Sequence, residues 1–293
     1  MMKYFEKAKY FLILMRPYQW VKNLFLFTPF FFSFQWSLEN FIKSLIGFIL
    51  FTLVSSAVYI FNDIKDIKED REHPTKKDRP LASGKVSKIE AFLLILFLAI
   101  PSIFISITFF RRFSFMLFLY IFLNVLYTMK IKHLSPLDII LIACNFIVRV
   151  IAGAIMIDVK VSMWIILVTF SLALFLSLAK RRDDILLSLN GIKVRKSISG
   201  YSLEMVNSAM TLMGGVTIVS YIMYTTSETV QQKLNTDKLY LTAFFVIVGI
   251  LRYFQITFVN QMSGDPSRVL LKDRFLQGVI LLWLLSFYLV VKI

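Results

Sequence analysis

The sequence predicts an all-α, polytopic membrane protein with about nine transmembrane helices. Of its 293 residues, 58% are hydrophobic and only 17% are charged, and the mean hydropathy is +0.72. The apolar residues are also gathered into long segments that are separated by polar loops. Water-soluble domains carry roughly half apolar and about a quarter charged residues, so this composition excludes a soluble enzyme.

A segment of about 20 apolar residues is long enough to cross a bilayer as a helix. Nine segments approach this length, and we expect spans at 21–36, 41–61, 89–110, 113–129, 136–157, 161–179, 205–226, 239–259 and 275–291. The pattern shows no internal repeat. We therefore expect one integral-membrane domain over residues 1–293.

The distribution of basic residues predicts the orientation of the chain. The 33 Lys and Arg residues outnumber the 18 Asp and Glu residues, and most of them fall in alternate connections between the expected spans. The positive-inside rule makes that side cytoplasmic, so we expect a cell-membrane protein with a cytoplasmic N-terminus and two long cytoplasmic loops. No basic domain lies outside these connections, which argues against nucleic-acid binding. The N-terminal segment lacks the features of a signal peptide and is expected to lie at the membrane interface.

The polar stretch at residues 61–88 carries the candidate catalytic residues. Asn62 opens it, and Asp63, Asp66 and Asp70 follow at helical spacing. On a continuous helix these offsets place the aspartates within roughly 60° of one another on one face. Three like charges on one face are unfavourable unless a cation lies between them, and carboxylate oxygens favour Mg²⁺. The alternative is a solvated, mixed-charge loop, which membrane proteins often have.

Basic side chains near this stretch are candidates for binding phosphate groups. Lys76, Lys77 and Arg79 follow the aspartates directly, and Lys22 enters the first expected span from the same side of the membrane. Lys180 and Arg181 end the sixth expected span. For these two residues the alternative is a positive-inside cluster with local salt bridges.

Two arginines fall within apolar segments. A guanidinium there costs several kcal/mol unless it is paired or faces a water-filled cavity, so each is a candidate functional residue. Arg149 lies deep in its segment, and we expect it to face a cavity and to bind a phosphate. Arg252 lies nearer the cytoplasmic end, where snorkelling to the interface is an equally good explanation. Asp265 precedes Pro266 and is expected to cap a helix.

The sequence NDIKDIKED at 62–70 resembles the NDxxDxxxD signature of the UbiA family of intramembrane prenyltransferases, and the expected span layout is similar over essentially the whole chain. The second aspartate motif of the family, DxxxD after the sixth span, is not matched, because Asp183 and Asp184 are adjacent here. Other segments resemble one branch, the decaprenyl-phosphate phosphoribosyltransferases: RPYQWVKN, NDIKDIKEDREHPTKKDRPLASG, KIKHLSPLDI, VRVIAGA, LAKRR and DPSRVLLKDR.

The resemblance implies transfer of 5-phosphoribose from phosphoribosyl diphosphate to a polyprenyl, decaprenyl-like phosphate, with release of pyrophosphate. In that reaction Mg²⁺ is the cofactor, Asn62, Asp63, Asp66 and Asp70 form the catalytic and metal site, and the cationic candidates bind phosphates. The lipid phosphate is already ionised at neutral pH, so catalysis requires positioning and electrostatic stabilisation rather than a general base. The resemblance also suggests a role in cell-wall biosynthesis.

Two other functions fit parts of the pattern. A conventional UbiA-type enzyme would transfer a prenyl group from a polyprenyl diphosphate to an aromatic acceptor such as 4-hydroxybenzoate, but it would use a second acidic motif. A non-enzymatic transporter of anionic lipid would use the cationic residues and leave the aspartates unexplained. The sequence leaves open the lipid chain length and whether the protein forms a homo-oligomer.

Overall fold

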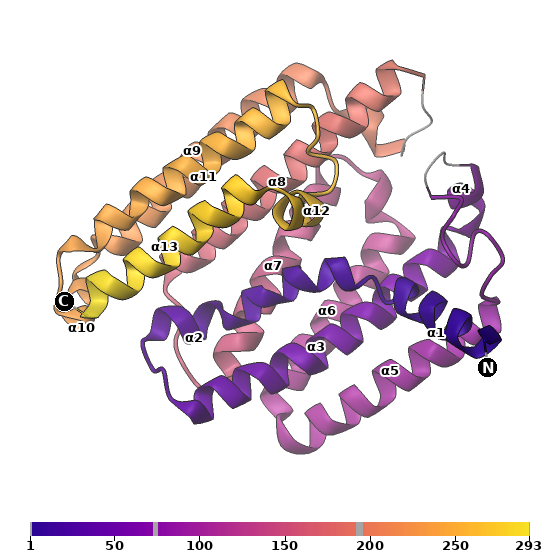
Figure 1. Cartoon of the computed structure of the whole chain (residues 1–293), viewed down its shortest axis with the longest axis horizontal. Helices are drawn as coiled ribbons and strands as arrows, with labels where there is room; N and C mark the ends of the chain where they lie inside the picture. Colours follow the sequence, from indigo (N-terminus) through magenta and orange to yellow (C-terminus); the bar gives the residue numbers. More distant parts are fainter. Residues whose placement is uncertain (1, 73–75, 192–195, 293) are drawn as a thin grey trace. The chain divides into compact units, whose positions relative to one another are not determined.

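The computed structural model describes residues 2–72, 76–191 and 196–292, and within these residues it contains helices and turns but no strand (Figure 1). This confirms the predicted all-α class. Eight helical segments of the described chain are long and apolar enough to cross a membrane. They are α3 (Leu38–Lys65), α5 (Lys88–Phe109), α6 (Arg111–Met129), α7 (Leu137–Met156), α8 (Met163–Leu189), α9 (Leu203–Thr225), the continuous segment Lys238–Val259, and α13 (Arg274–Lys292).

The segment expected as the first span differs from a continuous membrane helix. It consists of a 3-10 helix, η1 (Pro17–Phe27), followed by the short α2 (Thr28–Ser33). Arg16 precedes η1 in the left-handed region at φ 53°, and a proline lies in the first turn of each helix. Because proline cannot donate a backbone hydrogen bond, Pro17 and Pro29 are well placed at the starts of these two helices.

Helix α1 (Met2–Leu14) precedes the spanning segments. The short helices that connect them are α4 (Ile67–Glu72), η2 (Ile131–His133), η3 (Lys196–Gly200), α10 (Glu228–Leu234) and α12 (Pro266–Lys272). The segment Lys238–Val259 itself contains η4 (Lys238–Thr242), α11 (Ala243–Phe254) and the π-helix η5 (Gln255–Val259). Asp265 caps α12 by accepting a hydrogen bond from the Ser267 backbone N–H, as the sequence predicted.

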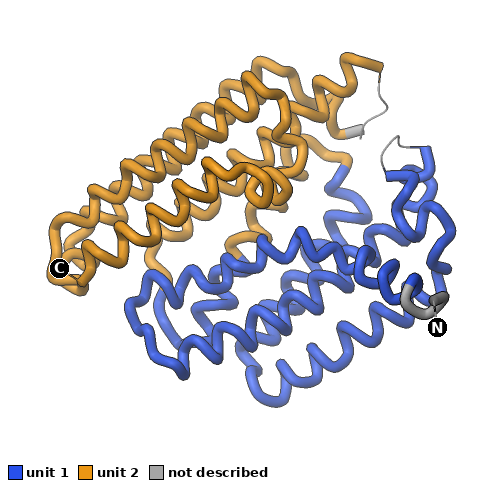
Figure 2. Tube along the Cα trace, viewed as in Figure 1, with its two compact units in different colours: residues 1–132, 148–160 blue, residues 133–147, 161–293 orange. Residues whose placement is uncertain are grey.

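The chain divides into two compact units (Figure 2). Unit 1 contains residues 1–132 and 148–160, and unit 2 contains residues 133–147 and 161–293. Helix α7 contributes its first part to unit 2 and its second part to unit 1. The single domain expected from the sequence stays a prediction.

Within unit 1, α3 is the central element and packs against α5, α6 and η1. Leu26 of η1, Phe51 of α3 and Tyr120 of α6 are buried in one apolar cluster with the second part of α7. Gly153 of α7 permits this packing, since a Cβ at that position would lie 2.0 Å from the Leu26 carbonyl oxygen. The close approach fixes η1 against α7 and so positions the polar side chains of η1.

Within unit 2, α8 lies along α9, and α11 packs against α13. Phe175 of α8, Met210 of α9 and Tyr253 of α11 belong to its apolar core. Each of the helices α8 and α9 begins with a serine whose side chain accepts a backbone N–H from the first turn, Ser162 and Ser202 respectively. These caps replace hydrogen bonds that the helix itself cannot make.

Candidate active site

The candidate active site is built around the C-terminal end of α3. This helix ends just before Asp66, whose backbone leaves the helical region at ψ 6°, and α4 begins just after it. The three aspartates therefore do not share one face of a single helix, and that expectation is wrong. They stay close because the chain turns rather than extends: the Asp66 N–H donates to the Asn62 carbonyl at 2.9 Å, and the Asp70 N–H donates to the Asp66 carbonyl at 2.8 Å.

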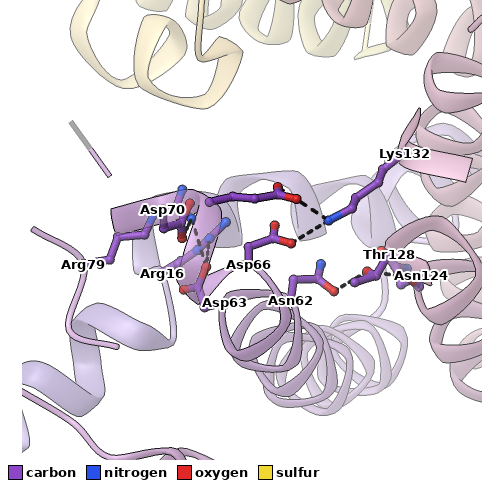
Figure 3. A network of polar contacts seen from close by, with 10 residues as sticks. Arg16, Asn62, Asp63, Asp66, Asp70, Arg79, Asn124, Thr128 and Lys132 are labelled. Atoms are coloured by element: carbon purple, nitrogen blue, oxygen red, sulfur yellow. Dashed lines mark hydrogen bonds and ion pairs between the residues drawn. The ribbon is translucent and has the colours of Figure 1, made fainter. Parts of the chain in front are cut away.

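Asp63 and Asp70 are joined by Arg79 (Figure 3). The Nη1 atom of Arg79 lies 3.0 Å from Asp63 Oδ1 and 2.7 Å from Asp70 Oδ2. Arg16 forms a second ion pair with Asp63. Both carboxyl side chains are buried, whereas those of Arg16 and Arg79 are 18% and 26% exposed. The carboxylates are thus covered by cations that still reach the surface of the unit.

Asp66 has a different cation. The Lys132 Nζ lies 2.6 Å from Asp66 Oδ1 and 3.9 Å from Glu69 Oε2. Lys132 follows α6 and is itself buried, and its ammonium reaches the aspartate from 66 residues away in the sequence. Figure 3 shows this pair on the opposite side of the α3 terminus from Arg79.

The surroundings of Arg16 raise its pKa above the usual value. Burial acts to lower this pKa, but the charge of Asp63 and the hydrogen bond to it outweigh burial, so the net shift is upward. Arg16 therefore remains a cation at any physiological pH and can pair with Asp63 or with a competing anion.

The carboxylate oxygens of this site suit a hard metal cation. In the described conformation they are paired with Arg and Lys side chains instead. Four carboxylates, those of Asp63, Asp66, Glu69 and Asp70, share three cationic partners. Oxygen donors of this kind are the ligands that Mg²⁺ prefers. Over residues 2–72, 76–191 and 196–292, no three His, Cys, Asp or Glu side chains converge on one point as a metal-binding group. Metal binding by Asp63, Asp66 and Asp70 therefore remains a proposal, and it requires the guanidinium and ammonium groups to give way.

Asn62 is held from α6. The Thr128 hydroxyl donates a hydrogen bond to Asn62 Oδ1 and also lies 2.8 Å from the Asn124 carbonyl oxygen of its own helix. Thr128 is buried and Asn62 is half-buried. The carboxamide is thus fixed at one end by a helix remote in sequence.

The predicted loop cations behave differently from one another. Arg79 joins the acidic network, whereas Lys77 is exposed and Lys76 is half-buried. The Lys76 carbonyl oxygen accepts the Arg79 backbone N–H at 3.0 Å, which helps to turn the loop toward the aspartates. Phosphate binding by Lys76 and Lys77 remains a proposal.

Arg149 is buried in unit 1, with 3% of the residue exposed. Its Nε donates to Asn23 Oδ1 at 2.9 Å, and its Nη2 donates to the Tyr120 hydroxyl at 3.2 Å. The guanidinium also lies over the rings of Phe51 and Tyr120, at 5.2 and 4.9 Å from their centroids. Asn23 is held in turn by donating to the hydroxyls of Thr52 and Ser55, both at 3.0 Å. Hydrogen bonds and ring faces thus stabilise the charge that the sequence placed inside a span.

Lys22 precedes Asn23 on η1 and is half-buried. Lys22, Arg149 and Arg16 all interact electrostatically with the hydroxyl of Tyr59, which lies one helical turn before Asp63 on α3. Arg16 also lies over the Tyr59 ring, 5.5 Å from its centroid. Three cations therefore gather beside α3, within one turn of the acidic network.

Unit 2 holds the two remaining predicted cations. The guanidinium of Arg181 lies 2.9 Å from Asp138 Oδ2 and 2.6 Å from Asp184 Oδ2, and its side chain is 1% exposed. The Tyr201 hydroxyl donates to Asp138, and burial together with this hydrogen bond raises the pKa of Tyr201. Lys180 is half-buried. The phosphate roles of Lys180 and Arg181 stay proposals, and the surroundings of Arg181 are those of a buried structural ion pair.

Asp183, Asp184 and Arg252 each have a hydrogen-bond or ion-pair partner within unit 2. Ser263 donates to Asp183 at 2.9 Å, and Asp184 pairs with Arg181. Arg252 binds Asp273 through Nε at 3.3 Å and Nη2 at 2.6 Å. The hydrogen bond from Arg252 lowers the pKa of Asp273. Arg252 thus forms an ion pair with a loop carboxylate, so its position is explained without a substrate.

Sequence reasoning missed Arg16, Lys132 and Thr128 as members of the site. Arg16 lies with Lys22 in the segment RPYQWVKN, and Lys132 lies with Lys130 in the segment KIKHLSPLDI. Both segments resemble one branch of the UbiA family. Charge balance could have identified these two cations, since buried aspartates need cations nearby. Thr128 carries no such signal, because a threonine near a helix end is common.

Comparisons with known proteins show the family of this chain. The model of the UbiA prenyltransferase family matches residues 24–284. A decaprenyl-phosphate phosphoribosyltransferase from Mycolicibacterium smegmatis is 30% identical over 281 residues, covering 92% of this chain and 88% of the relative. A decaprenyl-phosphate phosphoribosyltransferase from Corynebacterium glutamicum is 30% identical over 286 residues, covering 95% of this chain and 86% of the relative.

Solved structures show the same fold. A UbiA homologue from Archaeoglobus fulgidus bound to GPP and Mg²⁺ matches with a TM-score of 0.69 at 18% identity, covering 97% of this chain and all of that one. The match over nearly the whole of both chains agrees with the helical architecture described above. The extent of the family match, together with the eight apolar helices, shows that this chain is a multi-pass membrane protein of the UbiA prenyltransferase family.

Proposed function

We propose that this protein transfers 5-phosphoribose from phosphoribosyl diphosphate to a polyprenyl phosphate of the decaprenyl type, with release of pyrophosphate. The observation that carries the proposal is the network in which Arg79 bridges Asp63 and Asp70 while Lys132 holds Asp66. Such a network offers oxygen ligands for a metal and cations for phosphates in one place. The named relatives support the choice of substrates.

In the proposed site Asp63, Asp66 and Asp70 hold Mg²⁺ and Asn62 completes the catalytic group. A bound Mg²⁺ supplies positive charge to the pyrophosphate as it leaves. The cations that cover the carboxylates in the described conformation then turn to the phosphates of the donor: Arg16, Arg79 and Lys132, with Lys76 and Lys77 nearby. Because Arg79 is 26% exposed, this exchange does not require the core of the unit to open.

The reaction balances without a proton transfer. The bond from the anomeric carbon of ribose to the pyrophosphate oxygen breaks, and its electron pair leaves with pyrophosphate. An oxygen of the ionised lipid phosphate forms the new bond to the same carbon. The residues of the chain therefore act by orienting the two phosphates and by stabilising negative charge on the leaving group.

Arg149 and Lys22 are proposed to bind a phosphate deeper in unit 1. Arg149 is held rigidly by Asn23, so little side-chain entropy is lost when it binds an anion. The proposed arrangement places the soluble donor on the cytoplasmic side of the cell membrane, while the lipid enters from the bilayer. Lys180 of unit 2 is the remaining cation proposed to bind phosphate, whereas the ion pairs of Arg181 with Asp138 and Asp184 give Arg181 a structural role.

A two-tube radiolabel assay tests the proposal. Purified protein in detergent receives Mg²⁺ and long-chain polyprenyl phosphate with labelled phosphoribosyl diphosphate in one tube, and labelled prenyl diphosphate with 4-hydroxybenzoate in the other. We expect label from phosphoribosyl diphosphate to enter the lipid phase in the first tube. We expect no labelled, prenylated aromatic product in the second tube. Prenylation of the aromatic acceptor alone would identify a conventional prenyltransferase, and unchanged substrates in both tubes would favour a transporter.

One structural feature separates the first two outcomes. A conventional enzyme would use a second acidic motif, but Asp183 accepts from Ser263 and Asp184 is committed to Arg181. The chain therefore lacks the DxxxD arrangement that a conventional enzyme would use. This favours the phosphoribosyl donor.

A further inference from the structure

The contact between Thr128 and Asn62 links two helices at the proposed diphosphate site. Thr128 is 5% exposed and lies near the end of α6, whereas Asn62 belongs to α3, immediately before the first aspartate of the site. In Figure 3 the threonine approaches one end of the Asn62 carboxamide, and the other end is directed toward the side of Asp66.

The hydroxyl of Thr128 has one proton and two acceptors within reach, Asn62 Oδ1 and the Asn124 carbonyl oxygen at 2.8 Å. The Asn124 carbonyl lies within α6 and can accept the backbone N–H four residues later, so it does not depend on the hydroxyl. Asn62 Oδ1 is a side-chain oxygen for which the Thr128 hydroxyl is the donor that the structure describes. We therefore assign the hydroxyl proton of Thr128 to the hydrogen bond with Asn62 Oδ1.

This assignment decides which end of the carboxamide faces the site. With Oδ1 bound to Thr128, the Nδ2 group is presented on the side of Asp66. An amide Nδ2 donates two hydrogen bonds and cannot bind a metal cation, so its natural ligand at this site is a phosphate oxygen.

We propose that Thr128 is a positioning residue, which turns Asn62 so that its amide N–H groups donate to the diphosphate of the substrate. The inference rests on the proposed function only in assuming that a diphosphate binds here. It gives Asn62 a role different from that of the aspartates, namely holding the leaving group rather than the metal.

The test measures binding of inorganic pyrophosphate in the presence of Mg²⁺ to the purified full-length protein in detergent. Thr128→Val keeps the shape of the side chain and removes its hydroxyl, and we expect pyrophosphate to bind about tenfold more weakly. Thr128→Ser restores the hydroxyl and should bind within about twofold of the wild type. Thermal unfolding of the unliganded variants separates this effect from loss of fold.

A kinetic split provides the second readout. In the transfer assay, Thr128→Val should raise KM for phosphoribosyl diphosphate and leave KM for polyprenyl phosphate unchanged. A merely structural role would lower the amount of active protein and would leave both KM values unchanged. Equal changes in the two KM values, or unchanged pyrophosphate binding by Thr128→Val, would overturn the proposal.

The variant Asn62→Asp tests the orientation of the carboxamide. If the N–H groups face the diphosphate, a carboxylate there repels it, and pyrophosphate binding should be lost at every Mg²⁺ concentration. Binding retained with a lower Mg²⁺ requirement would mean that the oxygen faces the metal, which overturns the proposal. If the wild type binds no pyrophosphate, the diphosphate site itself is refuted, which is a separate failure of the proposed function.

Discussion

The acidic network of unit 1 and the ion-pair cluster of unit 2 use the same chemistry in opposite ways. The unit 1 network is Arg16, Asp63, Asp66, Asp70, Arg79 and Lys132, and the unit 2 cluster is Asp138, Arg181, Asp184 and Tyr201. In unit 1 the Arg79 side chain is 26% exposed, whereas in unit 2 Arg181 and Asp138 are 1% and 0% exposed. Both place arginine against aspartate, but only in the first can the cation be reached from outside.

The difference in exposure indicates which ion pairs can take part in ligand exchange. An accessible guanidinium that leaves a carboxylate is solvated by water or by an incoming phosphate, and a metal cation that takes its place keeps the buried carboxylate paired. A buried guanidinium that leaves its carboxylate strands two charges inside the protein, which costs several kcal/mol. The difference supports the proposal that the unit 1 network binds substrate and that the unit 2 cluster is structural.

The largest expected effect comes from metal removal. Treatment with EDTA should lower the transfer rate at least about 100-fold, because the metal is proposed to neutralise the leaving pyrophosphate. Thermal unfolding of the unliganded protein should stay unchanged, since the unit 1 carboxylates already have cationic partners. Added Mg²⁺ should restore the rate. Transfer that persists in excess EDTA would show that the reaction does not require a metal.

The next effect is on stability. Arg181→Met leaves the buried Asp138 carboxylate without its cation. We expect the free energy of unfolding to fall by about 3 to 5 kcal/mol. The measurement is the apparent Tm in detergent. Arg268→Met is the matched control, because Arg268 is 61% exposed and pairs with Asp265 at 3.6 Å; its loss should cost less than about 0.5 kcal/mol. Equal effects of the two variants would contradict the structural role of Arg181.

A smaller loss is expected from Tyr201→Phe. The substitution removes the hydroxyl that donates to Asp138 and leaves the ring in place. Hydrogen bonds to charged groups contribute about 1.5 to 3 kcal/mol, so the fall in stability should be smaller than for Arg181→Met. Because the two side chains share Asp138, the double variant should lose less than the sum of the single losses. Strict additivity would mean that the cluster is not a unit.

The smallest effect is a pH dependence at the accessible Arg252–Asp273 pair. The pKa of Asp273 is lowered in the folded protein by the hydrogen bond from Arg252. A depressed carboxyl pKa contributes stability that is fully present above the unfolded value of about 3.9 and is lost as the pH falls through the folded value. Wild type and Asp273→Asn should thus differ by less than about 1 kcal/mol at pH 7 and converge below about pH 4. A difference that grows on acidification would contradict the sign of the shift.

Composition alone predicted the membrane class, because long apolar segments have few other stable arrangements. The short helices at residues 17–33 could not be predicted from hydropathy, since a hydropathy window does not register the left-handed Arg16 or the proline in the first turn of α2. The turn at Asp66 was also missed. Helical spacing continues through it, while the backbone does not.

The aspartates of the site were found from their motif, but their partners were not. Arg16 is 47 residues from Asp63, and Lys132 is 66 residues from Asp66. No local pattern encodes a contact across such a distance. The same reason explains Arg181: next to Lys180 and Arg182 it resembled a surface cluster, whereas α8 directs it to Asp138 at the start of α7.

The most direct test of the account compares Asp63→Asn and Asp66→Asn with Asp138→Asn in the phosphoribosyl transfer assay, with each rate divided by the amount of folded protein. Asp158→Asn is the control, since Asp158 is 95% exposed and its positive φ of 52° suits asparagine. We predict that the first two variants fold and are inactive, whereas Asp138→Asn is destabilised and keeps its rate per folded molecule. Transfer by folded Asp66→Asn, or an inactive but stable Asp138→Asn, would contradict the assignment of chemistry to unit 1.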